Sequence, residues 1–245
     1  MNSDIAVIDS GVNPGHFHVQ GVSGGHGYRL NPEGQIEKNQ DFMDEIGHGT
    51  AICGIIRQKA SFANLYAIKI FQQDLNASGI SLIEAMKWAI DHRFNIIHLS
   101  LGVENENIAR DLKKLCQKAH DRNILIVASA KRPDHRIFPA FFQTVIGVYW
   151  NHDCGYDDII FHPDSRIEFG AHGWPRDIPG MPREQNFRGN SFAVAHVTAR
   201  VANLLKDFPD KGLSWIKDRL SKDAKTTHLT GQGTTDPSYS RKEAS

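Results

Sequence analysis

The sequence predicts an α/β fold built on a doubly wound parallel sheet. Short, wholly apolar segments, such as Ile5–Ile8 and Ile124–Ala128, alternate with longer segments in which apolar residues recur every three or four positions. The first pattern is typical of buried parallel strands and the second of amphipathic helices. Such alternation favours a single parallel sheet with right-handed crossovers and helices on both faces.

The first half of the chain is predicted to contain three strands, at Ile5–Ile8, Leu65–Ile70 and Asn95–Leu101. A helix of small and apolar residues, starting near 48 and running through 56, precedes the second strand. Another helix precedes the third strand and is opened by Ser81, because Ser81 and Glu84 have capping-box spacing. Residues 13–47 are rich in glycine and turn signals and are interpreted as a long surface excursion.

The second half continues the alternation. Its predicted strands are Ile124–Ala128 and Thr144–Val148, with short candidates at 158–161 and 166–169 in an otherwise irregular stretch. Its predicted helices are one with an apolar face of Ile108, Leu112, Leu115 and Ala119, one opened near Ser191 and ended by Pro209, and a last one at Leu213–Leu220. A proline ends a helix because it lacks the N–H and clashes with the preceding turn. We therefore expect one domain over 1–225 and a polar, disordered tail over 226–245.

Composition excludes several classes of protein. Lysine plus arginine and aspartate plus glutamate each number 28 in 245 residues, so no strong field favours nucleic acid or an anionic membrane as a partner. No apolar run approaches the roughly 20 residues that span a bilayer, and no signal peptide is visible at the N-terminus. Three scattered cysteines favour a reducing compartment over a disulfide framework. We expect a cytoplasmic protein.

Several polar residues are predicted to meet at one rim of the sheet. Asp9, Ser100 and the segment 129–132 follow strands, while His48 and Ser191 begin helices whose N-termini lie at the same edge. Three of these residues suit nucleophilic catalysis, in which His48 takes the proton of Ser191 and Asp9 orients the imidazole. Each residue alone also has a purely structural interpretation, as a turn cap, a helix-start histidine or a serine N-cap.

Four motifs carry a family resemblance. They are Asp9–Gly11, His48–Thr50, Ser100–Gly102 and Gly189–Ala193. In this order they resemble the blocks of the subtilisin-like serine proteases, whose catalytic residues also run Asp, His, Ser along the chain. The resemblance covers roughly residues 4–208.

The resemblance implies a three-layer αβα fold and a serine endopeptidase acting through an acyl-enzyme. It assigns the catalytic roles to Asp9, His48 and Ser191. It also makes Ser100, Leu101 and Gly102 the strand that pairs with an extended peptide substrate, by the backbone hydrogen bonds of β-augmentation. Ser129, at the end of the next strand, is expected to line the same substrate cleft.

One departure concerns the oxyanion hole. Family members place Gly-Asn after the fourth strand, and this asparagine donates to the oxyanion, whereas this chain has Lys131 and Arg132 there. Loss of such a donor lowers kcat by about 10²–10³-fold, whereas loss of the triad lowers it by about 10⁶-fold. A chain that keeps the triad residues but lacks this donor is therefore expected to be a slow protease and not an inactive one. Asn190 and Arg132 are the two candidate replacements. Lys131 and Arg132, near the expected substrate cleft, also predict a preference for acidic residues or a free carboxylate in the substrate.

No cofactor or metal is predicted. His16, His18 and His26 lack a carboxylate or cysteine at ligand spacing, and no calcium-loop pattern occurs. Cys53 falls where the family has a small alanine and is expected to pack within its helix. The sequence does not predict an oligomeric state.

Other functions stay open. A first strand only a few residues from Met1 leaves no room for a folding-assisting prodomain, and this predicts a narrow-specificity, intracellular peptide-processing enzyme. The rival is a pseudoprotease, a peptide-binding or scaffolding module without a working oxyanion hole. An esterase of the α/β-hydrolase type is disfavoured because its Gly-x-Ser-x-Gly motif would need glycine where Ala193 stands.

Overall fold

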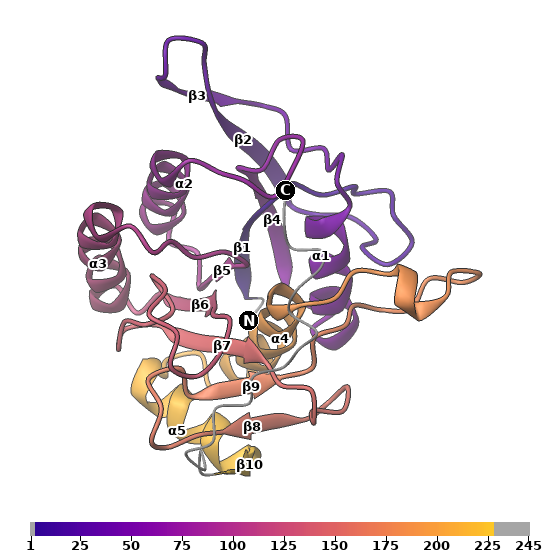
Figure 1. The fold of residues 1–245 in the computed structure, drawn as a ribbon, viewed down its shortest axis with the longest axis vertical. Coiled ribbons are helices and arrows are strands. Elements are labelled where there is room, and N and C mark those ends of the chain that lie inside the picture. Colours follow the sequence, from indigo (N-terminus) through magenta and orange to yellow (C-terminus); the bar gives the residue numbers. More distant parts are fainter. Residues whose placement is uncertain (1–2, 228–245) are drawn as a thin grey trace.

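A ten-stranded sheet forms the central layer, with strand order β10-β8-β9-β7-β6-β5-β1-β4-β2-β3 (Figure 1). The computed structural model of the protein describes residues 3–227. The strands are β1 Asp4–Asp9, β2 Gly24–Leu30, β3 Ile36–Asn39, β4 Asn64–Lys69, β5 Ile96–Leu99, β6 Leu125–Ser129, β7 Ile146–Trp150, β8 Ile159–Phe161, β9 Phe169–Ala171 and β10 Lys225–Thr226. The run from β9 through β7, β6, β5, β1 and β4 to β2 is parallel, and β2–β3 and β8–β9 are antiparallel pairs.

Helices cover both faces of this sheet, as predicted. They are α1 His48–Lys59, α2 Gly79–Asp91, α3 Glu106–Asp121, α4 Asn190–Asp207 and α5 Leu213–Asp223, with a short 3₁₀ turn, η1, at Arg183–Gln185. Buried residues of α1, α4 and α5 pack in one apolar cluster and those of α2 and α3 in another, so the sheet separates two helical layers (Figure 1). The doubly wound, three-layer prediction is confirmed.

The innermost helix is α4, which carries Ser191 in its first turn. Val194, Val197 and Val201 on this helix are fully buried against the sheet. Their burial fixes the position of α4 along its axis and its rotation about that axis. Gly189 caps the helix, and Phe208 ends it one residue before Pro209. The predicted extent of this helix is therefore confirmed.

The chain order brings the ends of two central strands together. From β1 the chain reaches β4 on one side of β1, and then crosses by α2 to β5 on the other side. Ligand sites of open α/β sheets lie at such a reversal, beyond the carboxyl ends of the strands. Asp9 ends β1 and Ser100 follows β5, so these two residues become neighbours.

The interpretation of residues 24–30 as turns was wrong, because they form β2 and pair with β4. The glycines there make room for neighbouring rings. A Cβ on Gly25 would lie 2.4 Å from the ring of Phe42, and one on Gly24 would lie 2.9 Å from the ring of Tyr66. Glycine in a strand often marks such a close approach, and here it hid the strand pattern.

Three smaller boundaries also differ. Ser78, not Ser81, caps α2, and its side chain accepts a hydrogen bond from the Ser81 amide. The strand predicted at 166–169 lies instead at β9. Thr226, taken as the start of the tail, pairs with Phe161 in β10, and the remaining predicted tail, 228–245, lies outside the described residues.

Across residues 3–227, no helix has the length and apolar character needed to cross a membrane.

Candidate active site

Asp9 and His48 form a buried acid–imidazole pair. The Nδ1 atom of His48 lies 2.8 Å from Oδ1 and 3.0 Å from Oδ2 of Asp9. Asp9 has no exposed surface and His48 is 4% exposed. Because a carboxylate only accepts, Nδ1 carries the proton and Nε2 is left as the basic nitrogen. This is the tautomer that a general base requires.

The backbone around the pair is fitted to hold the carboxylate. The Ser10 amide donates to Asp9 Oδ1 at 2.7 Å, and the Gly49 amide donates to the Ser10 hydroxyl at 2.9 Å. A Cβ on Gly49 would lie 2.2 Å from the carbonyl oxygen of Gly11 and 3.0 Å from Asp9 Oδ1. Glycine at 49 therefore lets the first turn of α1 approach the end of β1.

Asp44 is a site residue that the sequence analysis missed. Its oxygens accept hydrogen bonds from the Gly47 amide at 2.8 Å, the Thr50 amide at 2.8 Å and the Ser10 hydroxyl at 2.8 Å. It thus caps the N-terminus of α1, where Gly47 offers no side chain. The signal was present, because an aspartate just before a helix is a common cap.

Ser191 lies beside this pair, in the first turn of α4. Its hydroxyl donates to the carbonyl of Ser100 at 3.0 Å, and the Ser100 hydroxyl donates to Asp9, so Ser100 touches both. The ring of the next residue, Phe192, has its centroid 5.1 Å from that of His48. Within residues 3–227, no hydrogen bond joins Ser191 to His48. Catalytic hydrogen bonds are often long without substrate, and rotation of the Ser191 side chain would redirect its proton.

The contact between Asp9 and His48 shifts their pKa values in opposite directions. Burial alone would raise the pKa of Asp9, but the His48 charge and the hydrogen bonds from His48, Ser100 and Ser10 outweigh it, and the pKa is lowered. Burial alone would lower the pKa of His48, but the carboxylates of Asp9 and Asp44 outweigh it, and the pKa is raised. The site therefore strengthens the imidazole as a base.

The two candidate oxyanion donors lie in different surroundings. Asn190 is 8% exposed, and its Oδ1 accepts a hydrogen bond from the Trp150 amide at 2.8 Å. An amide donor requires an oxygen acceptor, so this contact fixes the orientation of the Asn190 side chain and leaves Nδ2 as a donor. Lys131 and Arg132 are exposed, in the loop after β6. Neither forms an ion pair with another described residue.

The segment expected to pair with a peptide has unused backbone groups. Leu101 and Gly102 form no backbone hydrogen bond within residues 3–227, whereas the next residue, Val103, bridges to Phe138. A Cβ on Gly102 would lie 2.6 Å from the Ile137 side chain, so glycine keeps this segment close to its neighbour. Ser129, at the end of β6, is 8% exposed.

The three histidines of residues 13–47 do not gather. His16 and His18 lie together, with ring centroids 5.1 Å apart, but His26 lies on β2 beside Trp88, with ring centroids 4.3 Å apart. In the described part of the chain, no three His, Cys, Asp or Glu side chains are placed to hold a metal ion.

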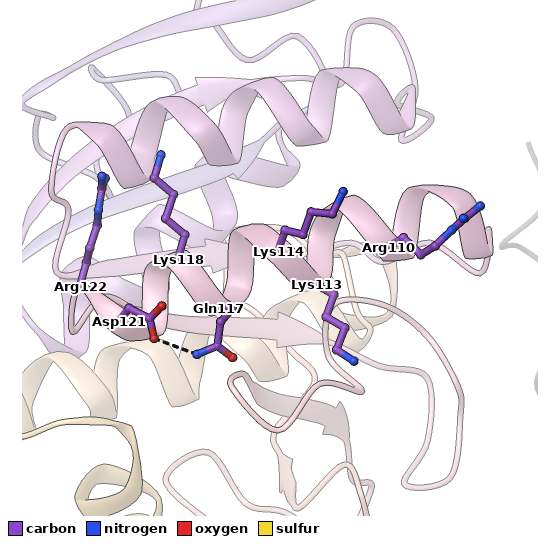
Figure 2. A pocket seen from close by; sticks show the side chains of 7 residues that line it. All are labelled: Arg110, Lys113, Lys114, Gln117, Lys118, Asp121 and Arg122. Carbon is purple, nitrogen blue, oxygen red and sulfur yellow. Dashed lines mark hydrogen bonds between the residues drawn. The ribbon is translucent and has the colours of Figure 1, made fainter.

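A concave surface away from this site lies along α3 (Figure 2). Its cations are largely neutralised, since Lys118 and Arg122 pair with Asp91 at 2.8 and 2.9 Å and Lys114 pairs with Asp111 at 3.2 Å. Exposed pairs of this kind are typical of a solvated helix face. We assign this surface no part in the site.

Solved structures share this fold. A lanthipeptide protease superposes with a TM-score of 0.70 at 18% identity, covering 88% of this chain and 78% of the other. The nisin leader peptidase NisP from Lactococcus lactis superposes with a TM-score of 0.68 at 17% identity, covering 89% and 81%. At such identities the likeness concerns the fold alone.

Comparison of the sequence with known proteins identifies relatives and a matching family model. The chain is 26% identical to the minor extracellular protease Epr of Bacillus subtilis (strain 168) over 90% of its length, and 25% identical to subtilisin E of the same strain over 91%. It spans 35% and 60% of the length of these two relatives. The model of the subtilase family matches residues 2–130, which is more than half of the chain. The chain therefore belongs to the subtilase family.

Proposed function

We propose that the chain is a serine endopeptidase in which Asp9, His48 and Ser191 form the catalytic triad. The observation that carries the proposal is the buried Asp9–His48 hydrogen bond, 2.8 Å long, at the strand end where Ser191 also lies. Membership of the subtilase family and the protease relatives support the same activity.

The reaction follows from the placement of these groups. His48 Nε2 takes the proton of the Ser191 hydroxyl as its oxygen attacks the scissile carbonyl. Asp9 holds the ring and balances the imidazolium that forms. The protonated imidazole then returns its proton to the leaving amine, and water hydrolyses the acyl-enzyme by the same route.

The oxyanion has two protein donors in this proposal. The Ser191 amide has no acceptor among the described residues, as expected in the first turn of a helix. The helix dipole at this end also favours negative charge. The second donor is Asn190 Nδ2, or else Arg132, in place of the asparagine that family members use.

We propose further that the substrate is a peptide bound in extended form along Ser100, Leu101 and Gly102, with Ser129 in the adjoining cleft. The free backbone groups at Leu101 and Gly102 support this mode of binding. Lys131 and Arg132, unpaired and exposed, would favour acidic residues near them. Because a leader peptidase shares the fold, we propose a narrow role in peptide maturation.

The cytoplasmic location stays a prediction. Cys53, Cys116 and Cys154 are all free thiols and all buried, which fits a reducing compartment. Immunodetection in separated cytoplasmic and external fractions tests it, and protein found only outside the cell contradicts it.

Labelling with a fluorophosphonate probe tests the activity. We expect covalent labelling of the wild type and none of Ser191→Ala. Ser221→Ala is a matched control, because the Ser221 hydroxyl also donates to a backbone carbonyl, of Asp218 at 2.8 Å, yet lies on α5. Labelling that persists in Ser191→Ala contradicts the assignment of the nucleophile.

Two observations favour the rival function, a peptide-binding pseudoprotease. The Ser191 hydroxyl donates to Ser100 instead of His48, and the usual oxyanion asparagine is replaced. A wild-type protein that binds peptides but is never labelled would establish this rival and reject the peptidase.

A further inference from the structure

A small cavity lies beside His48, and none of its lining residues belongs to the peptide-pairing segment Ser100–Gly102. Its volume is about 190 Å³, and Gly47, next to His48, lines it together with Phe187. The ring centroid of Phe187 is 5.8 Å from that of His48. Figure 1 shows the 172–188 segment extending past α1, whereas the chain that leaves β5 runs toward α3 on the opposite side. A peptide that enters along Ser100–Gly102 and crosses the triad therefore continues toward this cavity.

The cavity contains a cation, Arg176, that has no counter-ion among the described residues. Arg176 lines it, is partly buried, and donates from Nη1 to the His18 carbonyl at 3.3 Å. No carboxylate within residues 3–227 forms an ion pair with Arg176. A guanidinium has five N–H donors in a planar fork, so most of its donors remain available to a ligand.

Asp44 is the acidic residue among those that line the cavity, and its carboxylate already accepts hydrogen bonds from neighbouring protein groups. Both of its oxygens accept hydrogen bonds, from Ser10, the amides at the start of α1 and the Thr50 hydroxyl. Its negative charge is therefore balanced by the positive end of the helix dipole. Arg176 is left as the group in this cavity that lacks a partner of opposite charge.

The neighbouring His18 does not share the permanent charge of Arg176. Burial, together with the charges of Arg176 and His16, lowers the pKa of His18 to about 4. His18 is therefore neutral near pH 7, and the cavity offers a fixed guanidinium beside an uncharged imidazole. This arrangement suits a carboxylate, because arginine binds carboxylates through two parallel hydrogen bonds.

We propose that Arg176 is a specificity residue that binds a substrate carboxylate on the side of the scissile bond opposite to the part paired with Ser100–Gly102. The carboxylate belongs either to an aspartate or glutamate side chain or to a free C-terminus. This inference rests on the proposed peptidase function. It differs from the preference expected at Lys131 and Arg132, which belong to the loop after β6.

Matched peptides test the proposal. A positional-scanning library of quenched fluorogenic peptides supplies a cleaved sequence, which is then made with Glu or Gln at each position beyond the scissile bond, and with a C-terminal acid or amide. For the wild type we expect kcat/KM to be roughly tenfold higher for one carboxylate form over its neutral partner, the size expected of a charged hydrogen bond. The Glu/Gln pair and the acid/amide pair distinguish the two sources.

Variants then show whether the preference for a carboxylate depends on Arg176. We expect Arg176→Ala to bring the ratio close to one and Arg176→Lys to restore part of it. The ratio is taken within each variant, so a general loss of activity or stability cancels. Arg188→Ala is the matched control, because Arg188 belongs to the same segment but stacks on Trp174, with its guanidinium carbon 5.6 Å from the ring centroid.

Two results overturn the inference, namely a wild type indifferent to both pairs of peptides and a preference that survives in Arg176→Ala. Fluorophosphonate labelling keeps this failure separate from failure of the proposed function. A wild type that is labelled at Ser191 but shows no carboxylate preference rejects the role of Arg176 alone. A wild type that is not labelled rejects the peptidase and the inference with it.

Discussion

His48 is influenced by two carboxylates that act differently. Asp9 binds Nδ1 directly and fixes the tautomer, whereas Asp44 caps α1 and acts on the ring only through its charge. Burial would make the imidazolium unfavourable, and the two carboxylates reverse that effect. The basicity of His48 thus depends on a residue that never touches it.

The raised pKa of His48 predicts the pH dependence of acylation. Only neutral His48 can accept the Ser191 proton, so the rate of fluorophosphonate labelling should fall as pH decreases through the pKa of the folded enzyme. We expect the midpoint to lie above 6.5, the ordinary value for histidine. Labelling rates measured across the neutral range give the midpoint, and a value at or below 6.5 contradicts the role given to the carboxylates.

The oxyanion donors predict unequal effects of two substitutions. The side chain of Asn190 is held in place by the Trp150 amide, whereas Arg132 is exposed and unpaired. A preorganised donor contributes more than a mobile one, so Asn190→Ala should slow acylation by about 10²–10³ and Arg132→Ala by much less. Single-turnover rates, with peptide affinity measured alongside, test this. Wild-type rates in both variants would exclude both donors.

The start of helix α1 depends on Asp44. We expect Asp44→Ala to lower the free energy of unfolding by about 1–2 kcal/mol, the usual cost of a lost cap. It should also lower the pH midpoint of Ser191 labelling, because one source of the raised His48 pKa is removed.

Asp74→Ala is the control for this substitution. Asp74 also accepts a hydrogen bond from a backbone amide, that of Asn76 at 2.9 Å, but it lies in an exposed loop. Denaturant unfolding and the labelling profile give the two readouts. A midpoint that does not move in Asp44→Ala would show that Asp44 is only a cap.

The elements that local signals specify were predicted, and those that depend on tertiary contact were not. The wholly apolar run of β1 and the three-to-four-residue apolar period of α4 are visible in the residue order, because burial of these same residues forms the elements. β2 was missed because its glycines are explained only by Phe42 and Tyr66, which lie elsewhere in the sequence. Ser78 was missed because Ser81 offered an equally good local signal.

The same distinction applies to the site. Asp9, His48 and Ser191 lie in short motifs and were predicted as a trio, and the structure places Asp9 in contact with His48 and Ser191 beside Ser100. An aspartate before α1 is a visible cap signal, but the effect of its charge on His48 and the cavity at Arg176 arise where loops meet, and no local pattern in the sequence indicates these two features.

Several histidines, on β2, β5 and α4, are buried without full hydrogen bonding. His26, His98 and His196 each have a buried ring nitrogen with no partner among the described residues. Burial lowers the pKa of His26 and His98 to about 4 and that of His196 to about 3. Neutral rings are tolerated there, but charged rings would be buried without an acceptor.

This predicts a loss of stability in acid with a defined sign. A histidine with a lowered folded pKa contributes its full stability above about pH 6.5 and loses it as the pH falls toward 4, because the unfolded chain binds the proton first. For the fully buried His98 the loss is on the order of 3 kcal/mol between pH 7 and pH 4. His26 and His196 add to it in the same direction.

Denaturant unfolding at pH 7 and pH 4 measures the lost free energy of unfolding. A substitution of His98 shows how much of this loss comes from that residue. His98 lies between the sheet and α4, where its Nδ1 pairs with the Thr198 hydroxyl at 2.9 Å, so His98→Asn should reduce stability at pH 7. The variant should nevertheless lose roughly 3 kcal/mol less than the wild type on going to pH 4. His120→Asn, an exposed position on α3, should not change the difference. An equal loss in wild type and His98→Asn would show that acid acts elsewhere in the molecule, and that the pKa of His98 does not differ between the folded and unfolded chain.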